Sequence, residues 1–125
     1  MLTSAGVKKA TYYKIRSMSI ARQEIWDRKW RLIMFDIPEK KKVARRAINN
    51  VLKELGCVQY QKSVFITPFP CEKEIDTVGN YFGVRKHIMI VLAEKIESED
   101  TIKKNLQFVD MSLRQISLLY IHFAL

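Results

Sequence analysis

The chain has 125 residues, and 22 Lys and Arg against 13 Asp and Glu give it a formal net charge of +9 at pH 7. This length allows one domain with a real core, and a hydrophobic fraction of 48% is ordinary for a globular protein. The excess of positive charge favours a polyanionic partner, with nucleic acid ahead of a membrane surface, over a basic surface without a partner.

The cysteines and the apolar runs argue against several classes of protein. Cys57 and Cys71 form neither a CxxC pair nor a Cys/His ligand spacing, so we expect buried thiols and not structural zinc. No apolar run reaches the 18 residues that a membrane-spanning helix needs. We read no signal peptide, and these features together predict a cytoplasmic protein without a membrane partner.

The first 31 residues are strongly basic, because eight Lys and Arg side chains stand against only Glu24 and Asp27. The stretch VKKATYYKIRSMSIARQEIW lacks proline and has loosely helical apolar spacing, so we expect a helix there. Trp26 and Trp30 flank the first predicted strand. We expect these two side chains to clamp the basic segment onto the sheet.

Residues 29–55 predict a strand and then a helix. KWRLIMFDI (Lys29–Ile37) is a near-continuous apolar run, typical of a central strand that is buried on both faces. Pro38 ends the run and suits the first turn of a helix. Apolar residues then recur every three or four positions from Glu39 to Leu55, and Gly56 stands where a glycine commonly ends a helix.

Residues 57–96 predict two strands, a helix and a last strand. CVQYQKSVFITPF contains two short strand-like pieces that meet at Lys62-Ser63. Pro70 opens a second amphipathic helix, Gly83 ends it, and KHIMIVLAEKI (Lys86–Ile96) reads as another buried strand. The order β-α-β-β-α-β predicts an α+β, ferredoxin-like fold, in which a four-stranded antiparallel sheet carries its helices on one face.

The chain therefore divides into a basic N-terminal extension (1–28), a ferredoxin-like domain (29–96) and a C-terminal linker with a docking strand (97–125). Residues 97–110 are polar and predict a linker or a short helix. Ser117–Leu125 alternates apolar and other residues at the period of a strand. We expect this tail to pair with an edge of its own sheet or of a partner's sheet.

Three of these segments resemble a known family. RLIMFDIPEKKKVARR, LKELGCVQYQKSVF and HIMIVLAEKI resemble the Cas-two family, the small CRISPR-associated subunit of the spacer-integration complex. The first strand ends in an aromatic-Asp-Ile sequence, and Gln61–Phe65 matches the family's Gln-x-Ser-Val-Phe motif. The resemblance covers Trp30 to Ile96. It implies a homodimeric scaffold that holds duplex DNA during CRISPR adaptation, with the integrase subunit as a partner through the C-terminal tail.

A second resemblance gives the alternative function. WDRKWRLIMFDIPE and ITPFPCEKEID are similar to the central domain of phenylacetate-repressor-type transcription regulators, itself a relative of the Cas-two family. LTSAGVKKA resembles the last wing of a winged helix-turn-helix, although the recognition helix is not in this chain. This resemblance implies the dimerising core of a regulator, with a role in sensing a ligand.

Asp36 is the candidate catalytic and metal-binding residue. Cas-two proteins that cleave nucleic acid pair this aspartate with its copy across a two-fold axis to hold a divalent metal, so the resemblance implies Mg²⁺-dependent endonuclease activity. The alternative is that Asp36 caps the following helix through backbone N–H groups. Glu39 is either an outer ligand or a favourable first-turn charge. The chain departs from the nuclease pattern at Val43 and Gln59, so the resemblance supports DNA binding more than cleavage.

Basic side chains follow Asp36 closely. Lys41 and Arg45 lie four residues apart on the predicted helix, as do Lys42 and Arg46, and such a stripe can follow a phosphate backbone. The alternative is a solvated helix face. The candidate nucleic-acid-binding residues are Lys40, Lys41, Lys42, Arg45, Arg46, Lys53, Lys62, Ser63, Arg28 and Arg31.

Overall fold

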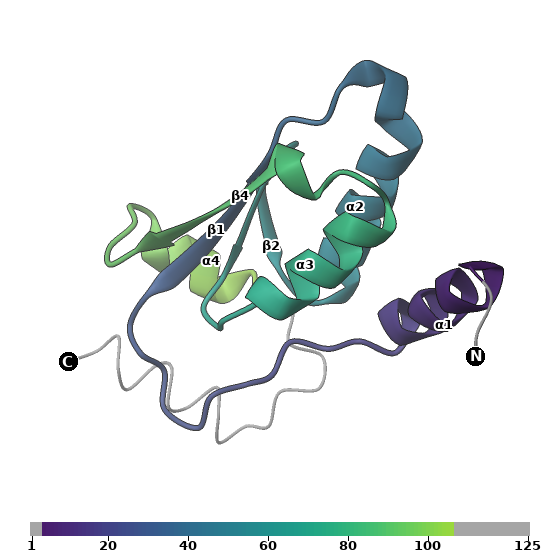
Figure 1. Ribbon diagram of the computed structural model, residues 1–125. Coiled ribbons are helices and arrows are strands. Elements are labelled where there is room, and N and C mark those ends of the chain that lie inside the picture. The colour runs from purple at the N-terminus through teal and green to yellow at the C-terminus, as the bar shows by residue number, and fades with distance from the viewer. Residues whose placement is uncertain (1–3, 107–125) are drawn as a thin grey trace.

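The computed structural model describes residues 4–106, where a four-stranded antiparallel sheet has the strand order β2-β3-β1-β4 (Figure 1). The order of strands and helices confirms the predicted ferredoxin-like α+β fold. Within this part of the chain, no helix has the length and apolar character needed to cross a bilayer. The elements are α1 (Ser4–Arg16), β1 (Trp30–Phe35), η1 (Glu39–Lys41), α2 (Lys42–Glu54), β2 (Val58–Gln61), β3 (Val64–Thr67), α3 (Glu72–Tyr81), η2 (Arg85–His87), β4 (Ile88–Ala93) and α4 (Glu99–Lys104).

Strand β1 forms the centre of the sheet, because β3 pairs with one of its edges and β4 with the other. Ile33 lies opposite Phe65 of β3, and both side chains are fully buried. Phe35 stacks on Phe65 with ring centroids 6.2 Å apart. Gln59, in the same row on β2, donates to Asn49 of α2 at 3.4 Å. Since alternate residues of a strand face opposite sides, this row faces the layer of α2 and α3.

Glycines end both helices of that layer. Gly56 and Gly83 have φ angles of 88° and 70°, a left-handed conformation that is strained for residues with a Cβ atom. After α2, the Gly56 N–H donates to the Lys53 carbonyl and the Cys57 N–H donates to the Leu52 carbonyl. The same pair of bonds follows α3. This Schellman pattern satisfies the last carbonyls of each helix and confirms both predicted helix ends.

Helix α4 lies on the other face of the sheet and covers only one end of it (Figure 1). Ile102 of α4 is buried in the core, and the Trp30 indole Nε1 donates to Glu99 Oε1 at 2.8 Å. The short helix predicted as one option for 97–110 is therefore present at Glu99–Lys104. The predicted strand Ser117–Leu125 lies outside the described residues.

Helix α1 ends earlier than the sequence predicted. The helix stops at Arg16, and residues 17–29 reach β1 without a regular element, so the prediction of helix as far as Trp26 is wrong. Ser17 accounts for the stop in part, because its hydroxyl lies within bonding distance of the carbonyls of Tyr13 and Lys14, at 3.1 and 3.2 Å. Such side-chain bonds to the backbone compete with helix continuation.

The segment before β1 is fixed to the sheet by an aromatic pair and a partly buried ion pair. Trp26 is buried and packs edge-on against Trp30 with ring centroids 5.2 Å apart, which confirms the predicted clamp. The Arg31 guanidinium, buried at 5% exposure, donates to Asp27 Oδ1 at 2.9 Å and to the Pro68 carbonyl at 2.8 Å. A buried cation needs such partners because its desolvation is otherwise uncompensated. Arg31 thus ties the incoming chain to the loop after β3.

We expect Asp27→Asn to remove an acid-dependent part of the stability. The hydrogen bond from Arg31 lowers the pKa of Asp27 below its usual value. A lowered folded-state pKa adds stability above the unfolded pKa of about 4, and this part is lost as the pH falls through the folded-state value. Asp27 is 42% exposed, so the contribution is at most about 1 kcal/mol.

Urea unfolding between pH 7 and pH 2 measures this difference. The free energy of unfolding of the native chain should approach that of the Asp27→Asn variant as the pH falls below 4. A constant difference between the two chains over the whole pH range would contradict the role assigned to this ion pair.

Candidate functional site

Three chain segments meet at one end of the sheet. Asp36 directly follows β1, Ser63 precedes β3 and His87 precedes β4. The Phe35 N–H donates to the Ser63 carbonyl at 3.0 Å, and the Asp36 N–H donates to the His87 carbonyl at 2.9 Å. These bonds continue the strand pairing past the strand ends. They bring the predicted site residues Asp36 and Ser63 to the same end of the sheet, together with His87.

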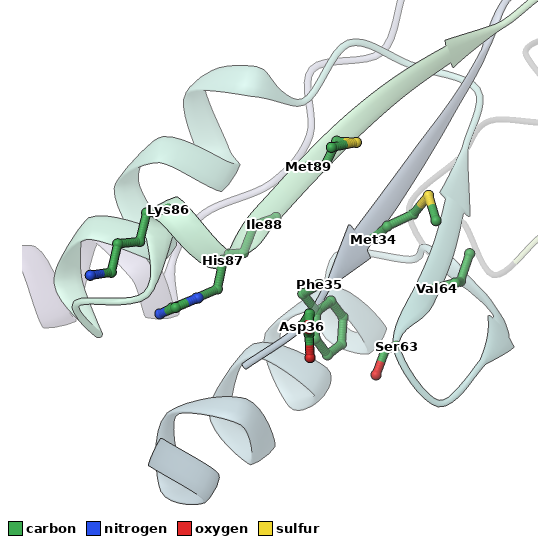
Figure 2. A pocket seen from close by; sticks show the side chains of 9 residues that line it. All are labelled: Met34, Phe35, Asp36, Ser63, Val64, Lys86, His87, Ile88 and Met89. Carbon is green, nitrogen blue, oxygen red and sulfur yellow. The ribbon is translucent and has the colours of Figure 1, made fainter. Parts of the chain in front are cut away.

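A shallow hollow lies beside this end of the sheet, on the face that α4 leaves uncovered (Figure 2). Figure 2 shows Met34, Met89 and Val64 on the neighbouring strands β1, β4 and β3. Met34 lies directly opposite both of the other two residues in the sheet register. Met89 is 63% exposed and Met34 is 39% exposed, which is high for large apolar side chains. The hollow is lined by Met34, Phe35, Asp36, Ser63, Val64, Lys86, His87, Ile88 and Met89.

The exposed methionines correct one expectation. The sequence predicted that β1 and β4 are buried on both faces, and this is wrong at Met34 and Met89. An antiparallel sheet can leave part of one face uncovered, and α4 packs only near Trp30. An unbroken apolar run does not show which face is covered. The sequence therefore gave no signal for this patch until the register of β1 and β4 was known.

The carboxylate of Asp36 is exposed and makes no hydrogen bond or ion pair with the described residues. The 3₁₀ turn that follows has Pro38 at its N-cap and no side-chain cap. The alternative role of Asp36 as a helix cap is therefore wrong. Glu39, the candidate outer ligand, pairs with Arg45, whose NH2 donates to Glu39 Oε2 at 3.1 Å.

The described residues fit a divalent metal only in part. Among residues 4–106, no group of three or more His, Cys, Asp or Glu side chains could hold a metal ion. Asp36 is available, but it is one carboxylate, and Mg²⁺ needs further oxygen ligands. Cys57 and Cys71 are free and buried as predicted, and burial raises the pKa of both thiols, that of Cys71 to about 12. Neither cysteine suits a thiolate ligand.

Helix α2 carries a line of exposed cations. Lys42, Arg46 and Lys53 occupy one face of the helix at spacings of four and seven residues, and all three side chains are exposed. No ion pair engages them within the described residues. At 1.5 Å per residue this α2 cation line extends over about 16 Å. Its spacing and its freedom from ion pairs suit contact with a phosphate backbone, although Glu54 directly follows Lys53 on the same helix.

The other predicted cations are not gathered on this line. Lys41 Nζ donates to the Gly83 carbonyl, and Arg45 bonds Glu39, so both stabilise the turn before α2. Arg31 is buried beside Asp27, and its predicted contact with nucleic acid is therefore wrong. The remaining predicted cations are exposed on separate segments: Arg28, Lys40 and Lys62.

Comparison with known families gives one match. The family described as the PaaX protein central Cas2-like domain matches residues 23–105. The match spans the four strands, α2, α3 and α4, and it begins after α1. Searches among characterised proteins and among solved structures gave no significant match. The family match favours the regulator resemblance over spacer integration, and it gives no support to an integrase partner.

We expect Asp36→Asn to change the free energy of unfolding by no more than about 0.5 kcal/mol at pH 7, since the exposed carboxylate has no partner to lose. A helix cap would cost about 1 kcal/mol on removal. Chemical denaturation of the two chains side by side measures the difference. A loss of 1 kcal/mol or more would show that Asp36 supports the fold and is not held free for another role.

Proposed function

Because the chain belongs to the family of the PaaX protein central Cas2-like domain, we propose that it is the dimerising and DNA-backbone-binding core of a PaaX-type transcription regulator. The observation that carries this proposal is the uncovered apolar patch of Met34, Met89 and Val64, which we call the methionine patch. It lies on the face of the sheet opposite α2, because its residues alternate along the strands with the row that faces α2 and α3.

The methionine patch suits contact with a second copy of the chain. Its residues lie in register on three neighbouring strands, so they form one continuous surface and not scattered exposed side chains. A two-fold dimer uses the same patch on both copies, which requires a self-complementary surface. The methionine patch meets this requirement because methionine side chains adapt their shape to a neighbour. The Cas-two resemblance implies a homodimer as well.

Dimerisation through this patch leaves the DNA-binding helix free. Helix α2 packs on the opposite face of the sheet, where Gln59 bonds Asn49, so its exposed side points away from the patch. Each copy therefore presents one α2 cation line on the outside of the dimer. Such lines supply affinity that is independent of base sequence, through the release of counterions from phosphate.

Metal-dependent cleavage is a second and weaker candidate. The free carboxylate of Asp36 favours it, but one chain supplies a single carboxylate at this edge of the described structure. Mg²⁺ would supply a Lewis acid for phosphodiester hydrolysis only if a second copy contributed its own Asp36. Incubation of duplex DNA with the chain and Mg²⁺ separates the candidates: the regulator core predicts intact DNA, and cleavage abolished by Asp36→Ala would support the nuclease.

We expect Met89→Glu to weaken dimerisation by tenfold or more, because a charge in an apolar contact costs over about 1.4 kcal/mol when it is left unpaired. Leu92→Glu is the matched control. Leu92 lies on the same strand, is 54% exposed against 63% for Met89, and faces the other side of the sheet. Sedimentation equilibrium over a range of concentrations measures both variants and the native chain.

The control should dissociate as the native chain does, and circular dichroism should show that both variants are folded. Equal weakening by the two variants would contradict the methionine patch as the interface. A native chain that stays monomeric at every concentration would contradict dimerisation itself.

We expect Arg46→Gln to lower the affinity for duplex DNA and to reduce the slope of log affinity against log salt by about 1, which corresponds to one lost phosphate contact. Lys104→Gln on α4 removes the same charge from an exposed position on the opposite side of the sheet. Fluorescence anisotropy with a labelled duplex across a salt series measures the slopes. Equal slopes for the two variants would show that the α2 cation line has no special role.

A further inference from the structure

A row of aromatic rings crosses from α1 to α3 on the outside of the domain. The centroids of Tyr13 and Tyr12 lie 5.9 Å apart, those of Tyr12 and Tyr81 lie 6.4 Å apart, and those of Tyr81 and Phe82 lie 4.8 Å apart. Tyr13 is 59% exposed and Tyr12 is 42% exposed. We call these four residues the aromatic row. Its outer rings are not used to build the core, although ring faces are costly to leave in water.

Cations accompany the α1 end of the aromatic row. The Arg16 guanidinium carbon lies 5.7 Å from the centroid of the Tyr12 ring, and Arg16 NH1 donates to the Tyr12 hydroxyl at 3.1 Å. Lys9 is exposed one helical turn before Tyr13. No Asp or Glu occurs before Glu24 in the sequence, so α1 itself carries no acid, although the charge of Glu54 on α2 acts on Arg16.

The α3 end of the row also meets a cation. Lys41 Nζ donates to the carbonyl of Gly83, the residue that directly follows Phe82, at 3.2 Å. Lys41 precedes Lys42, the first residue of the α2 cation line. Cationic groups therefore stand at both ends of the aromatic row, and the second end adjoins the surface proposed above for a phosphate backbone.

We propose that the aromatic row is a binding surface for single-stranded nucleic acid, with bases stacked on Tyr12 and Tyr13 and phosphates held by Lys9 and Arg16. Aromatic side chains beside cations are the combination that binds unpaired strands without sequence preference, because every base has a π face. Arginine adds to this surface through its own contact with the ring.

The chemistry of the row favours an unpaired strand over the other partners. The bases of an intact duplex already stack on one another, so a duplex has no base face to offer to Tyr13. An apolar protein surface would gain from the rings but nothing from Lys9 and Arg16, which it would have to desolvate. Tyr12 and Tyr13 of α1 lie before the matched residues 23–105, whereas Tyr81 and Phe82 lie within them, so the aromatic row joins α1 to the shared family domain.

Tyr13→Ala tests the inference, with Tyr13→Phe retaining the ring as one control. Tyr60→Ala is a second, matched control, because Tyr60 is 61% exposed on β2 and lies outside the aromatic row. Fluorescence anisotropy with labelled oligothymidylate and oligouridylate measures single-strand affinity for DNA and RNA. A labelled duplex of equal length measures duplex affinity in parallel.

We expect Tyr13→Ala to weaken binding of at least one single strand by about tenfold, within the range for loss of one stacked base. Tyr13→Phe and Tyr60→Ala should bind as the native chain does, and the duplex affinity of Tyr13→Ala should be unchanged. No effect of Tyr13→Ala on either single strand, or an equal effect on single strands and duplex, would overturn the inference. The duplex affinity of Arg46→Gln tests the proposed function alone, and the single-strand affinity of Tyr13→Ala tests the aromatic row alone. Failure of one proposal can therefore be told from failure of the other.

Discussion

The pairing of β1 on both of its edges is the constraint on which the rest of the molecule depends. Because β3 and β4 both run antiparallel to β1, the residue after β1 and the residues before β3 and β4 meet at one end. Backbone bonds from Phe35 and Asp36 extend this pairing beyond the strands. The same pairing sorts side chains into two rows, one buried under α2 and α3 and the other only partly covered by α4.

The position of each cation in the fold also decides whether it is bonded within the domain or exposed to solvent. Arg31 lies on the buried side of the central strand, where Asp27 and the Pro68 carbonyl bond its terminal nitrogens, while its Nε has no partner among the described residues. Arg45 is held by Glu39 at the start of α2. Lys42 and Arg46 project from the solvent side of that helix and make no ion pair in the described part of the chain. Charge available for a polyanion is therefore a property of position and not of the net +9.

The sequence predicted the fold well because its signals were local. Periodic apolar residues in α2, and glycines at positions 56 and 83, defined the helices and their ends. The strand register, and the part of each sheet face that a helix covers, depend on residues far apart in the sequence. The exposure of Met34 and Met89 depends on which strand pairs with theirs and on how far α4 extends over the sheet. Neither can be predicted from a single segment of the sequence. The burial of Arg31 was missed because it depends on the central place of β1 in the sheet and on Pro68, 37 residues away, although Asp27 is only four residues away.

We propose that a second copy of the chain covers the methionine patch. Solution NMR of the native chain labelled at the methionine methyl groups tests it directly, with a soluble paramagnetic agent added at high and at low protein concentration. Dimerisation through the patch predicts that the Met34 and Met89 signals are protected from the agent at high concentration and broadened on dilution. If the Met34 and Met89 signals broaden as strongly at high concentration as at low concentration, the methionine patch is not the dimer interface.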